Sequence, residues 1–273
     1  MQPLVSICIP CYNAAPFIGE TLQSVLAQTY ANLEIIICDD CSKDNTLEAV
    51  KTFTDPRIAI HVNAQNLGSS GNYNKALSYA TGKYAKLLCA DDMIAPDCIE
   101  KQVKAFEENA DKNIVLVTAE KRIIKQNGKY LFTKKFPGRG GLINGKKAVR
   151  KSIRNGTNII GEPGLPLMKT ETLRQTSGVT EDKYFTYCND FDLWCKMLLH
   201  GNLFVIKEPL FSFRIVATST TSKTGRQQAK VVKDYFTLLH RQNLHNISKP
   251  TLILGKCMVN LMTLARNMIY KFM

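Results

Sequence analysis

The chain contains, at residues 84–92, the stretch Tyr84-Ala85-Lys86-Leu87-Leu88-Cys89-Ala90-Asp91-Asp92. A short apolar run that is closed by polar residues predicts a buried strand leading into a loop. At the carboxyl end of a strand in an open parallel sheet, Asp91 and Asp92 lie where ligands bind. Adjacent carboxylates repel each other unless a positive charge lies nearby, and a divalent cation that holds phosphates supplies one. An Asp-rich turn that caps the next helix explains the same residues.

Three more apolar runs precede this stretch, at residues 4–9, 33–38 and 58–62. Helical patterns follow them at about residues 16–26, 45–53 and 70–80, and strands that alternate with helices in this way predict parallel βαβ units. The first two runs end at polar pairs, Tyr12-Asn13 and Asp39-Asp40. Because parallel strands end at the same edge, we expect these pairs and Asp91-Asp92 to line one edge of one sheet.

Composition limits the class of protein. The 273 residues are 45% hydrophobic and 22% charged, which is ordinary for a globular chain with a full core. One large domain with a smaller appendage is the default expectation. Residues 1–100 carry 6 Lys or Arg and 11 Asp or Glu, whereas residues 101–273 carry 30 and 12. This asymmetry predicts that the front of the chain meets cations or hydroxyls and that the back meets anions.

The 9 cysteines are odd in number and scattered. We therefore expect reduced thiols in a cytoplasmic protein rather than a disulfide framework or a zinc site. The first residues lack a basic segment followed by a long apolar one, which argues against a secretory signal. No uncharged apolar run of about 18 residues occurs, so no membrane-spanning helix is predicted.

At this point the sequence resembles the family 2 glycosyltransferases, which have the GT-A fold. The matching segments, in order, are VSICIPCYN (5–13), SVLAQTY (24–30), EIIICDDCS (34–42), NLG (66–68), ATGKY (80–84) and Asp91-Asp92. Each segment alone is a weak signal, but six in register are specific. The resemblance implies a Rossmann-like mixed central sheet flanked by helices, and an inverting enzyme of the bacterial surface-glycan type.

The resemblance also implies roles for residues of the first half. The nucleotide of a sugar donor is expected to contact Pro10, Tyr12, Asn13, Asp40, Asn66 and Asp91. Tyr12 is expected to stack on a pyrimidine, and the Asp40 carboxylate to accept a hydrogen bond from uracil N3–H, while Asp39 caps a helix. Asp91 and Asp92 are expected to hold Mn²⁺ or Mg²⁺, which bridges the donor phosphates. The family pattern has Asp where this chain has Cys89, and a thiol is a poor ligand for a hard cation.

Two further segments resemble motifs of the family's acceptor half. In YFTYCNDFDLW (184–194), Asn189 replaces the usual Glu, and Asp190 is retained as the expected general base that deprotonates the acceptor hydroxyl. Capping of the following helix is the alternative for Asp190, and a structural role is expected for Asp192. In FSFRIVATS (211–219), Arg214 is retained but Val216 stands where the family has His.

The segment from Lys121 to Arg154 contains 12 Lys or Arg and no acid. Its glycines, Gly138, Gly140, Gly141 and Gly145, make it look rich in loops. A solvated basic face is one interpretation. The other is a surface that faces anions, either a phosphate-bearing acceptor or an acidic lipid leaflet.

The C-terminal residues predict an amphipathic helix. Its apolar positions follow helical spacing: Leu254, Met258, Leu261, Ala265, Met268 and Phe272. Such a helix lies on a cytoplasmic leaflet, packs on the chain's own core, or packs on a partner subunit. We expect a GT-A domain at residues 1–220, with a nucleotide-sugar half (1–110) and an acceptor half (111–220), and a helical extension at 221–273.

The leading hypothesis is an inverting, metal-dependent glycosyltransferase. It moves a hexosyl or N-acetylhexosaminyl group from a UDP-linked donor to a glycan or polyprenyl-diphosphate-linked acceptor, in the cytoplasm or at the inner face of the plasma membrane. A basic nucleic-acid-binding protein is a weaker alternative, because aromatic residues are sparse in the basic segment and no nucleic-acid-binding module is evident. A nucleotidyltransferase requires a Gly-rich basic loop after the first strand, and Pro10-Cys11-Tyr12-Asn13 is not one.

Overall fold

The computed structural model describes residues 2–216 and 225–271, without the side chains of residues 183, 225–226 and 266–271. The strands are β1 Val5–Cys11, β2 Leu33–Asp39, β3 Ile58–Val62, β4 Tyr84–Leu87, β5 Met93–Ile94, β6 Ile114–Ile124, β7 Tyr130–Lys134, β8 Gly141–Ile143, β9 Leu167–Lys169 and β10 Asn202–Arg214. The α-helices are α1 Ile18–Leu26, α2 Thr46–Lys51, α3 Gly68–Ser78, α4 Cys98–Glu107, α5 Gly145–Arg154, α6 Thr170–Arg174, α7 Asn189–Met197, α9 Gly225–Arg241 and α10 Lys249–Lys271. Short 3-10 helices are η1 Ala110–Lys112, η2 Lys183–Cys188 and η3 Leu244–Asn246.

The described strands form a single mixed sheet. Its order is β3-β2-β1-β4-β9-β6-β10-β5, with β7 paired to β6 and β8 to β10. The strands β3, β2, β1 and β4 are parallel, whereas β9 is antiparallel to both β4 and β6. The predicted α/β mixed sheet is therefore confirmed, with four parallel strands from the first half of the chain and a second parallel pair, β6 and β10, from the second half.

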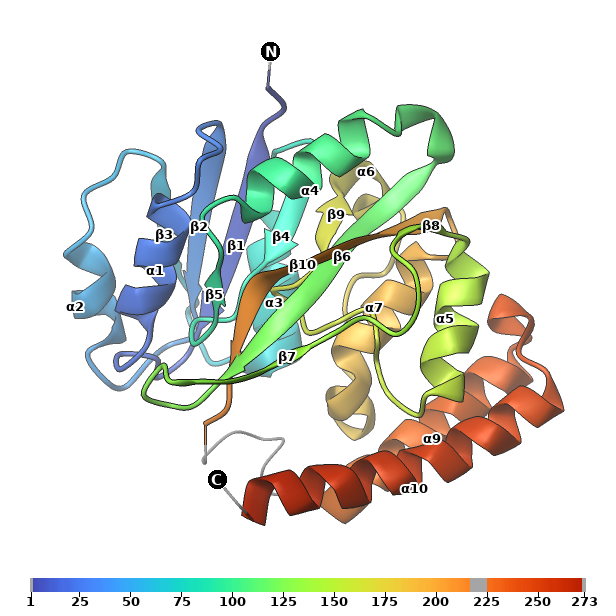
Figure 1. Cartoon of the computed structure of the whole chain (residues 1–273). Helices are drawn as coiled ribbons and strands as arrows, with labels where there is room; N and C mark the ends of the chain where they lie inside the picture. Colours follow the sequence, from blue (N-terminus) through green and yellow to red (C-terminus); the bar gives the residue numbers. More distant parts are fainter. Residues whose placement is uncertain (1, 217–224, 272–273) are drawn as a thin grey trace.

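Helices cover both faces of this sheet (Figure 1). One core contains apolar residues of α1, α2 and α4, including Ile18, Leu22 and Phe106. The other contains residues of α3, α5, α7, α9 and α10, including Trp194 and Phe236. Strands β1, β2 and β4 are buried on both faces, which explains why residues 5–9 and 35–38 are mostly apolar, whereas the edge strand β3 is partly exposed.

The expectation of a loop-rich segment between Lys121 and Arg154 was wrong. Strand β6 continues to Ile124, and β7, β8 and α5 follow it. In α5, Ala148, Val149 and Ile153 are buried on one side. Because basic residues occupy the remaining positions, the narrow apolar stripe was hard to recognise in the sequence.

Two cysteine pairs have the CxxC spacing of zinc and redox motifs, Cys8 with Cys11 and Cys38 with Cys41. Residues three apart on a strand point to opposite faces, and Cys8 and Cys11 accordingly lie in different cores. All nine cysteines are free. The expected reduced state stays a prediction, and the argument from scattered positions had overlooked both pairs.

Helices α9 and α10 form an antiparallel hairpin beside α5 (Figure 1). The buried positions of α10 are Leu252, Gly255, Val259 and Thr263. Two members of the predicted apolar stripe, Leu254 and Leu261, are instead 43% and 54% exposed. These two positions face outward, whereas Met258 and Ala265 are half-buried. A Cβ at Gly255 or Gly156 would clash across the contact between α10 and the end of α5, so these glycines mark the packed face. Met268 and Phe272 lie outside the described side chains.

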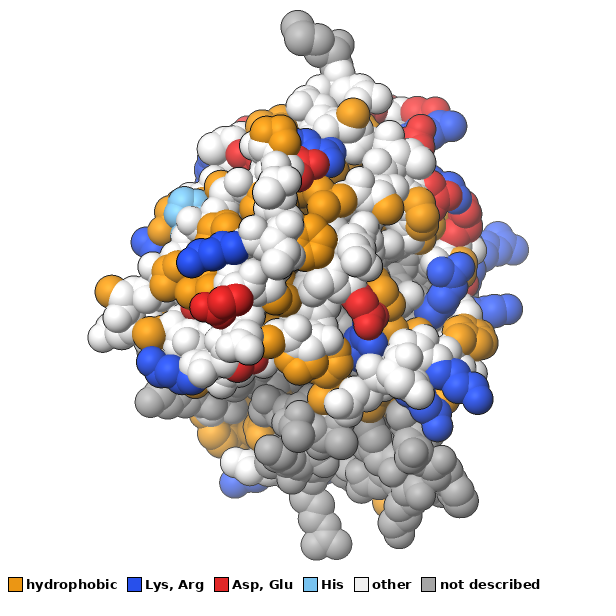
Figure 2. Space-filling view, turned by 90° about the vertical axis from the view of Figure 1, so that its left-hand side faces the viewer, with side chains coloured by type: hydrophobic (Ala, Val, Ile, Leu, Met, Phe, Trp, Pro, Cys, Tyr) orange, Lys and Arg blue, Asp and Glu red, His pale blue; other side chains and the backbone are white. Residues whose placement is uncertain are grey.

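No helix within residues 2–216 and 225–271 is both long enough and apolar enough to cross a membrane. Figure 2 shows the side of the molecule that lies at the left of Figure 1, where acidic and basic side chains are interspersed. Lys and Arg side chains are most frequent at the right-hand margin of that view. The molecule thus does not present one continuous basic surface on this side.

Candidate active site

Three neighbouring parallel strands deliver the predicted donor-site residues to one edge of the sheet. Cys11 pairs with Asp39, so β1 and β2 end together, and Cys8 pairs with Leu87 near the end of β4. The backbone N–H of Asp40 donates to the carbonyl oxygen of Cys11 (2.8 Å). The expectation that these strand ends line one edge is confirmed.

Asp40 organises the loop between β3 and α3. Its carboxylate is 2% exposed and accepts hydrogen bonds from Asn63 Nδ2 (2.8 Å) and from the backbone N–H groups of Leu67 (2.8 Å) and Gly68 (2.9 Å). Asn66 Nδ2 donates to the Asp40 carbonyl oxygen (3.0 Å). A carboxylate has about four acceptor positions. Three are used within the protein, so at most one on Oδ2 is left for a nucleotide base.

The loop after β1 presents an aromatic ring to solvent. Tyr12 is 49% exposed, whereas Pro10 is buried within β1. Asn13 adopts a φ of 50°, its N–H donates to Ser42 Oγ (3.0 Å), and its Oδ1 accepts from the N–H of Lys43 (2.8 Å). These bonds join the ends of β1 and β2 and fix the backbone beside Tyr12, so the ring is available to stack on a ligand.

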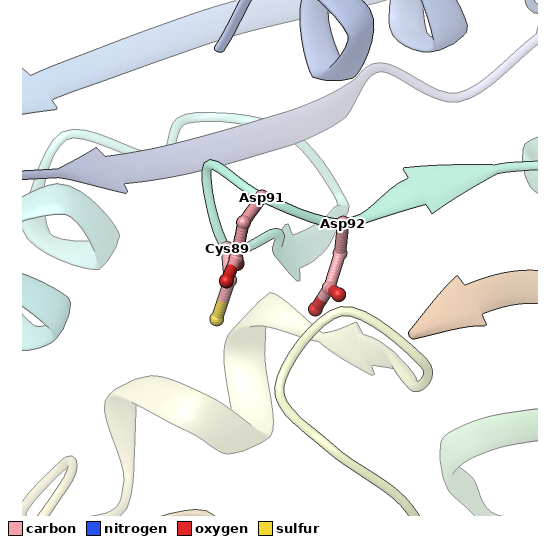
Figure 3. Close-up of side chains that lie close together, drawn as sticks. All are labelled: Cys89, Asp91 and Asp92. Atoms are coloured by element: carbon pink, nitrogen blue, oxygen red, sulfur yellow. The ribbon is translucent and has the colours of Figure 1, made fainter. Parts of the chain in front are cut away.

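The turn between β4 and β5 carries Cys89, Asp91 and Asp92. Their ligand atoms lie within 4.8 Å of one another, and the side chains project to the same side of the turn (Figure 3). Burial raises the pKa of Asp91, and burial together with the charge of Asp91 raises the pKa of Asp92 well above its usual value. Two desolvated carboxylates repel each other, and a divalent cation bound between them would offset their negative charge. The pair therefore fits a site for such a cation.

Cys89 is geometrically close enough to join such a site, but its chemistry argues against it. Burial and the charges of Asp92 and Asp91 raise the pKa of the thiol well above its usual value. Its Sγ lies 3.4 Å from the hydroxyl oxygen of Tyr73 in α3. A protonated thiol is a poor ligand for Mg²⁺ or Mn²⁺. The ligands of a cation at this site would therefore be the carboxylates of Asp91 and Asp92.

Arg214, at the end of β10, holds this turn in place. Its backbone N–H donates to Asp92 Oδ1 (2.9 Å), and its Nε donates to the Asp91 carbonyl oxygen (2.8 Å). Its guanidinium also donates to the carbonyl oxygen of Gln126 (2.7 Å) and to the carboxylate of Glu20 (2.5 Å). Arg214 is buried, and it ties a strand of the second half to the carboxylates of the first.

Asp190 lies in the first turn of α7 and is half-buried. Its Oδ1 accepts from the N–H of Phe191 (2.7 Å), and its Oδ2 accepts from Asn158 Nδ2 (3.0 Å). Burial raises its pKa to about 6, opposed by these hydrogen bonds. The charge of Asp190 also contributes to the raised pKa values of Tyr73 and Cys89.

Other residues in and beside the segment 184–194 support the structure around Asp190. Asp192 accepts from the hydroxyl of Tyr235 in α9 (2.9 Å) and pairs with Lys196 (2.6 Å). The buried Trp194 donates from Nε1 to the carbonyl oxygen of Gly161 (2.8 Å). Asn189, which replaces the family's Glu, donates to Ser70 Oγ (3.4 Å). Val216 is buried and offers no polar group.

Three polar residues near Asp190 were missed in the sequence. Asn158 donates to Asp190, and Glu162 forms an ion pair with the buried Lys121. The charge of Glu162 contributes to the raised pKa values of both Asp190 and Asp92. The only sequence signal was one acid, Glu162, directly after a long acid-free segment.

A mixed GT-A-type sheet with paired carboxylates at one strand end, and a third carboxylate from a helix of the second half, is typical of the glycosyltransferase class. The sequence profile of glycosyl transferase family 2 matches residues 6–162 of this chain. The chain therefore belongs to glycosyl transferase family 2, and it is an enzyme of the glycosyltransferase class.

Similar proteins include a bacterial glucosyltransferase and a solved structure with a bound nucleotide sugar. The chain is 39% identical over 136 residues to Escherichia coli UDP-Glc:alpha-D-GlcNAc-diphosphoundecaprenol beta-1,3-glucosyltransferase WfgD, covering 49% of this chain and 53% of WfgD. The structure of S. aureus TarS in complex with UDP-GlcNAc is similar with a TM-score of 0.69 at 18% identity, over 87% of this chain and 66% of that one.

Another solved structure shares the fold. The mannosyltransferase PcManGT from Pyrobaculum calidifontis, in complex with GDP-Man and Mn²⁺, has a TM-score of 0.66 at 20% identity, over 94% of this chain and 70% of that chain. At these identities the two structures show the fold alone. The chain spans about half of WfgD and about two thirds of the TarS chain.

Proposed function

We propose that this glycosyltransferase moves a sugar, with inversion, from a UDP-linked donor to a glycan or polyprenyl-diphosphate-linked acceptor in bacterial polysaccharide synthesis. The observation that carries the proposal is the convergence of carboxylates from both halves. Asp91 and Asp92 form one cluster with Cys89. Tyr73 of α3 contacts Cys89, and Ser70 of the same helix accepts a hydrogen bond from Asn189, the neighbour of Asp190. Inverting transfer requires both a group that offsets leaving-group charge and a base.

The donor binds along the strand ends of the first half. The exposed Tyr12 ring stacks on the base, and the free acceptor position of Asp40 faces it, while Pro10, Asn13 and Asn66 shape the loops that surround the nucleotide. Asp91 and Asp92 hold Mn²⁺ or Mg²⁺. When bound, the cation offsets the negative charge that develops on the leaving nucleotide diphosphate.

Asp190 acts on the acceptor. Its carboxylate takes the proton of the acceptor hydroxyl as the oxygen forms a bond to the anomeric carbon of the donor, and the bond from that carbon to the diphosphate breaks. Asn158 fixes one carboxylate oxygen and the N–H of Phe191 fixes the other, so the base is oriented before the acceptor arrives. A pKa of about 6 keeps the group ionised at neutral pH yet basic enough to accept a proton.

The outward face of α10 supports contact with an anionic membrane. Ile253, Leu261 and Leu264 are 64%, 54% and 61% exposed, and residues 235–273 contain no Asp or Glu. An apolar helix face that is flanked only by basic charge suits an acidic leaflet. Such contact places the enzyme at the inner face of the plasma membrane, where a polyprenyl-linked acceptor is presented.

Calorimetric titration of UDP and GDP, each with and without Mn²⁺, tests the donor site. We expect Mn²⁺-dependent binding of UDP to the wild type and its loss in the Asp91→Asn/Asp92→Asn variant. An Asp111→Asn variant, which changes an exposed acid in η1, is the matched control and should bind like the wild type. Tighter binding of GDP than of UDP would contradict the UDP assignment, and metal-independent binding of both would contradict the metal site.

A further inference from the structure

A small cavity lies directly behind Asn158. Its lining includes three lysine side chains, Lys121, Lys134 and Lys135, together with Asn158 and Phe136. Lys121 belongs to β6 and Lys134 ends β7, so the lysines come from two strands that pair with each other. The cavity lies within the basic segment of residues 121–154, whose partner the sequence left open.

The cavity wall that carries Lys134 and Lys135 is anchored from its far side. The backbone N–H of Phe136 donates to Glu120 Oε1 (3.2 Å), and Lys207 Nζ donates to the carbonyl oxygen of Phe136 (2.9 Å). Lys151 donates to the carbonyl oxygen of Pro137. Phe136 itself is buried. These contacts fix the backbone after Lys135, so the position of the two lysines relative to Asn158 is set by the fold.

Positive charge exceeds negative charge among the side chains at this cavity. Glu162 pairs with Lys121, and the charge of Lys134 also helps to lower the pKa of Glu162. Lys134 and Lys135 are exposed, and the residues that line the cavity include three lysines and no Asp or Glu. The excess favours an anionic ligand.

Asn158 connects the cavity to the proposed base. Its side chain lines the cavity, and its Nδ2 donates to Asp190 Oδ2 (3.0 Å). A ligand in the cavity thus contacts the same side chain that orients Asp190. This arrangement suits an acceptor whose reacting hydroxyl lies at Asp190 and whose charged group lies beside Asn158.

We propose that Lys134 and Lys135 bind a phosphate group of the acceptor, an inference that rests on the proposed function. The ammonium groups of the lysines donate hydrogen bonds to phosphate oxygens, and Lys121 stays paired with Glu162. Two acceptors share this chemistry: a sugar linked through diphosphate to a lipid, and a polymer whose units are joined by phosphodiesters. The site selects phosphate-bearing acceptors over neutral glycans.

The first test is calorimetric titration of inorganic pyrophosphate in EDTA, so that no divalent cation recruits the probe to Asp91 and Asp92. We compare the wild type, Lys134→Ala/Lys135→Ala, and Lys146→Ala/Lys147→Ala. The last variant removes an equally exposed pair of adjacent lysines from α5. We expect binding to weaken at least fivefold in the first double variant and to be unchanged in the second. Absence of binding to the wild type, or equal weakening in both variants, overturns the proposal.

Competition then identifies the source of the phosphate. Geranyl diphosphate and poly(glycerol phosphate) are each titrated against bound pyrophosphate. Displacement by the first supports a lipid diphosphate, displacement by the second supports a phosphodiester polymer, and displacement by neither overturns the acceptor role. UDP binding in Mn²⁺ is measured on the same three proteins. Its absence from the wild type would contradict the proposed function, whereas its retention in both variants isolates the lysine site.

Discussion

The two halves of the sheet assemble their site residues in different ways. In the first half, Tyr12 and Asp40 directly follow β1 and β2, and Asp91 lies in the turn after the neighbouring parallel strand β4, so their spatial proximity follows from the strand order. In the second half, Asp190 comes from a helix, and Asn158 and Glu162 come from the loop that precedes β9. The donor half is therefore built from local motifs at strand ends, and the acceptor half from long-range contacts between dissimilar elements.

The substitution with the largest expected effect should impair catalysis in the second half and leave donor binding in the first half unchanged. We expect Asp190→Asn to lower kcat by about 10²–10⁴-fold, because the amide cannot take the acceptor proton. Mn²⁺-dependent UDP binding should be unchanged, since Asp190 makes no hydrogen bond to Asp91 or Asp92 among the described contacts. Steady-state kinetics and calorimetry on one protein preparation measure both quantities. Loss of UDP binding would show that the halves are not separable.

Arg214 provides a test of the opposite kind, because it connects the halves. We expect Arg214→Lys to lose bonds to Gln126 and Glu20, to destabilise the fold by about 1–3 kcal/mol, and to lower kcat/KM by at least about tenfold. Thermal unfolding and kinetics measure these effects. Glu20→Gln is the control, since the Glu20 side chain is 51% exposed and its loss should cost less. Equal effects of the two changes would contradict the connecting role.

The pH dependence sharpens the assignment of the base. Asp190 acts in its deprotonated form, and its pKa is raised to about 6, so kcat/KM should be constant above that pH and fall about tenfold per unit below it. Glu162 contributes to the raised pKa and Lys121 lowers it. Glu162→Gln should therefore move the midpoint of the profile to lower pH. A profile that stays flat well below pH 6, or an unchanged midpoint in the variant, would argue against Asp190 as the titrating base.

The smallest effect is expected at α10, whose described residues are not part of the candidate active site. Leu264→Asp places a charge on the exposed apolar face and should reduce co-sedimentation with phosphatidylglycerol vesicles several-fold. Gln242→Glu adds a negative charge at the exposed end of the α9–α10 hairpin and should have little effect. Activity on a water-soluble acceptor should be the same in both variants. Unchanged vesicle binding of Leu264→Asp would contradict membrane contact through this face.

Much of the fold was predictable from the sequence, and the reason is local. Strand β3 was expected at residues 58–62 and has those bounds, and β1 and β2 extend the expected runs by one or two residues. Strands β1 and β2 are almost entirely buried, so their sequences are mostly apolar, whereas β3 is a partly exposed strand at the edge of the sheet. Strands β7 and β8 and helix α5 were missed, because their stability comes from pairing with β6 and β10 and from a narrow apolar stripe.

The candidate site divides in the same way. The placement of Asp40 and Asp91-Asp92 at one edge was predictable, whereas the use of three Asp40 acceptor positions within the protein was not. The apolar stripe of α10 was recognised, but not its outward orientation. Periodicity shows that a helix has two faces. Only the close packing at Gly156 and Gly255 decides which face is buried.

The sequence by itself determined the family, the parallel donor half and the positions of the carboxylates, because each depends on residues adjacent in the chain. The tertiary structure alone decided the partners of those carboxylates: Arg214 on the β4–β5 turn, Asn158 on Asp190, and Glu162 on Lys121. These partners are about 30 to 120 residues apart in sequence, and no local pattern encodes such distances. Long-range contacts arise only when the sheet order and the loop paths are fixed together.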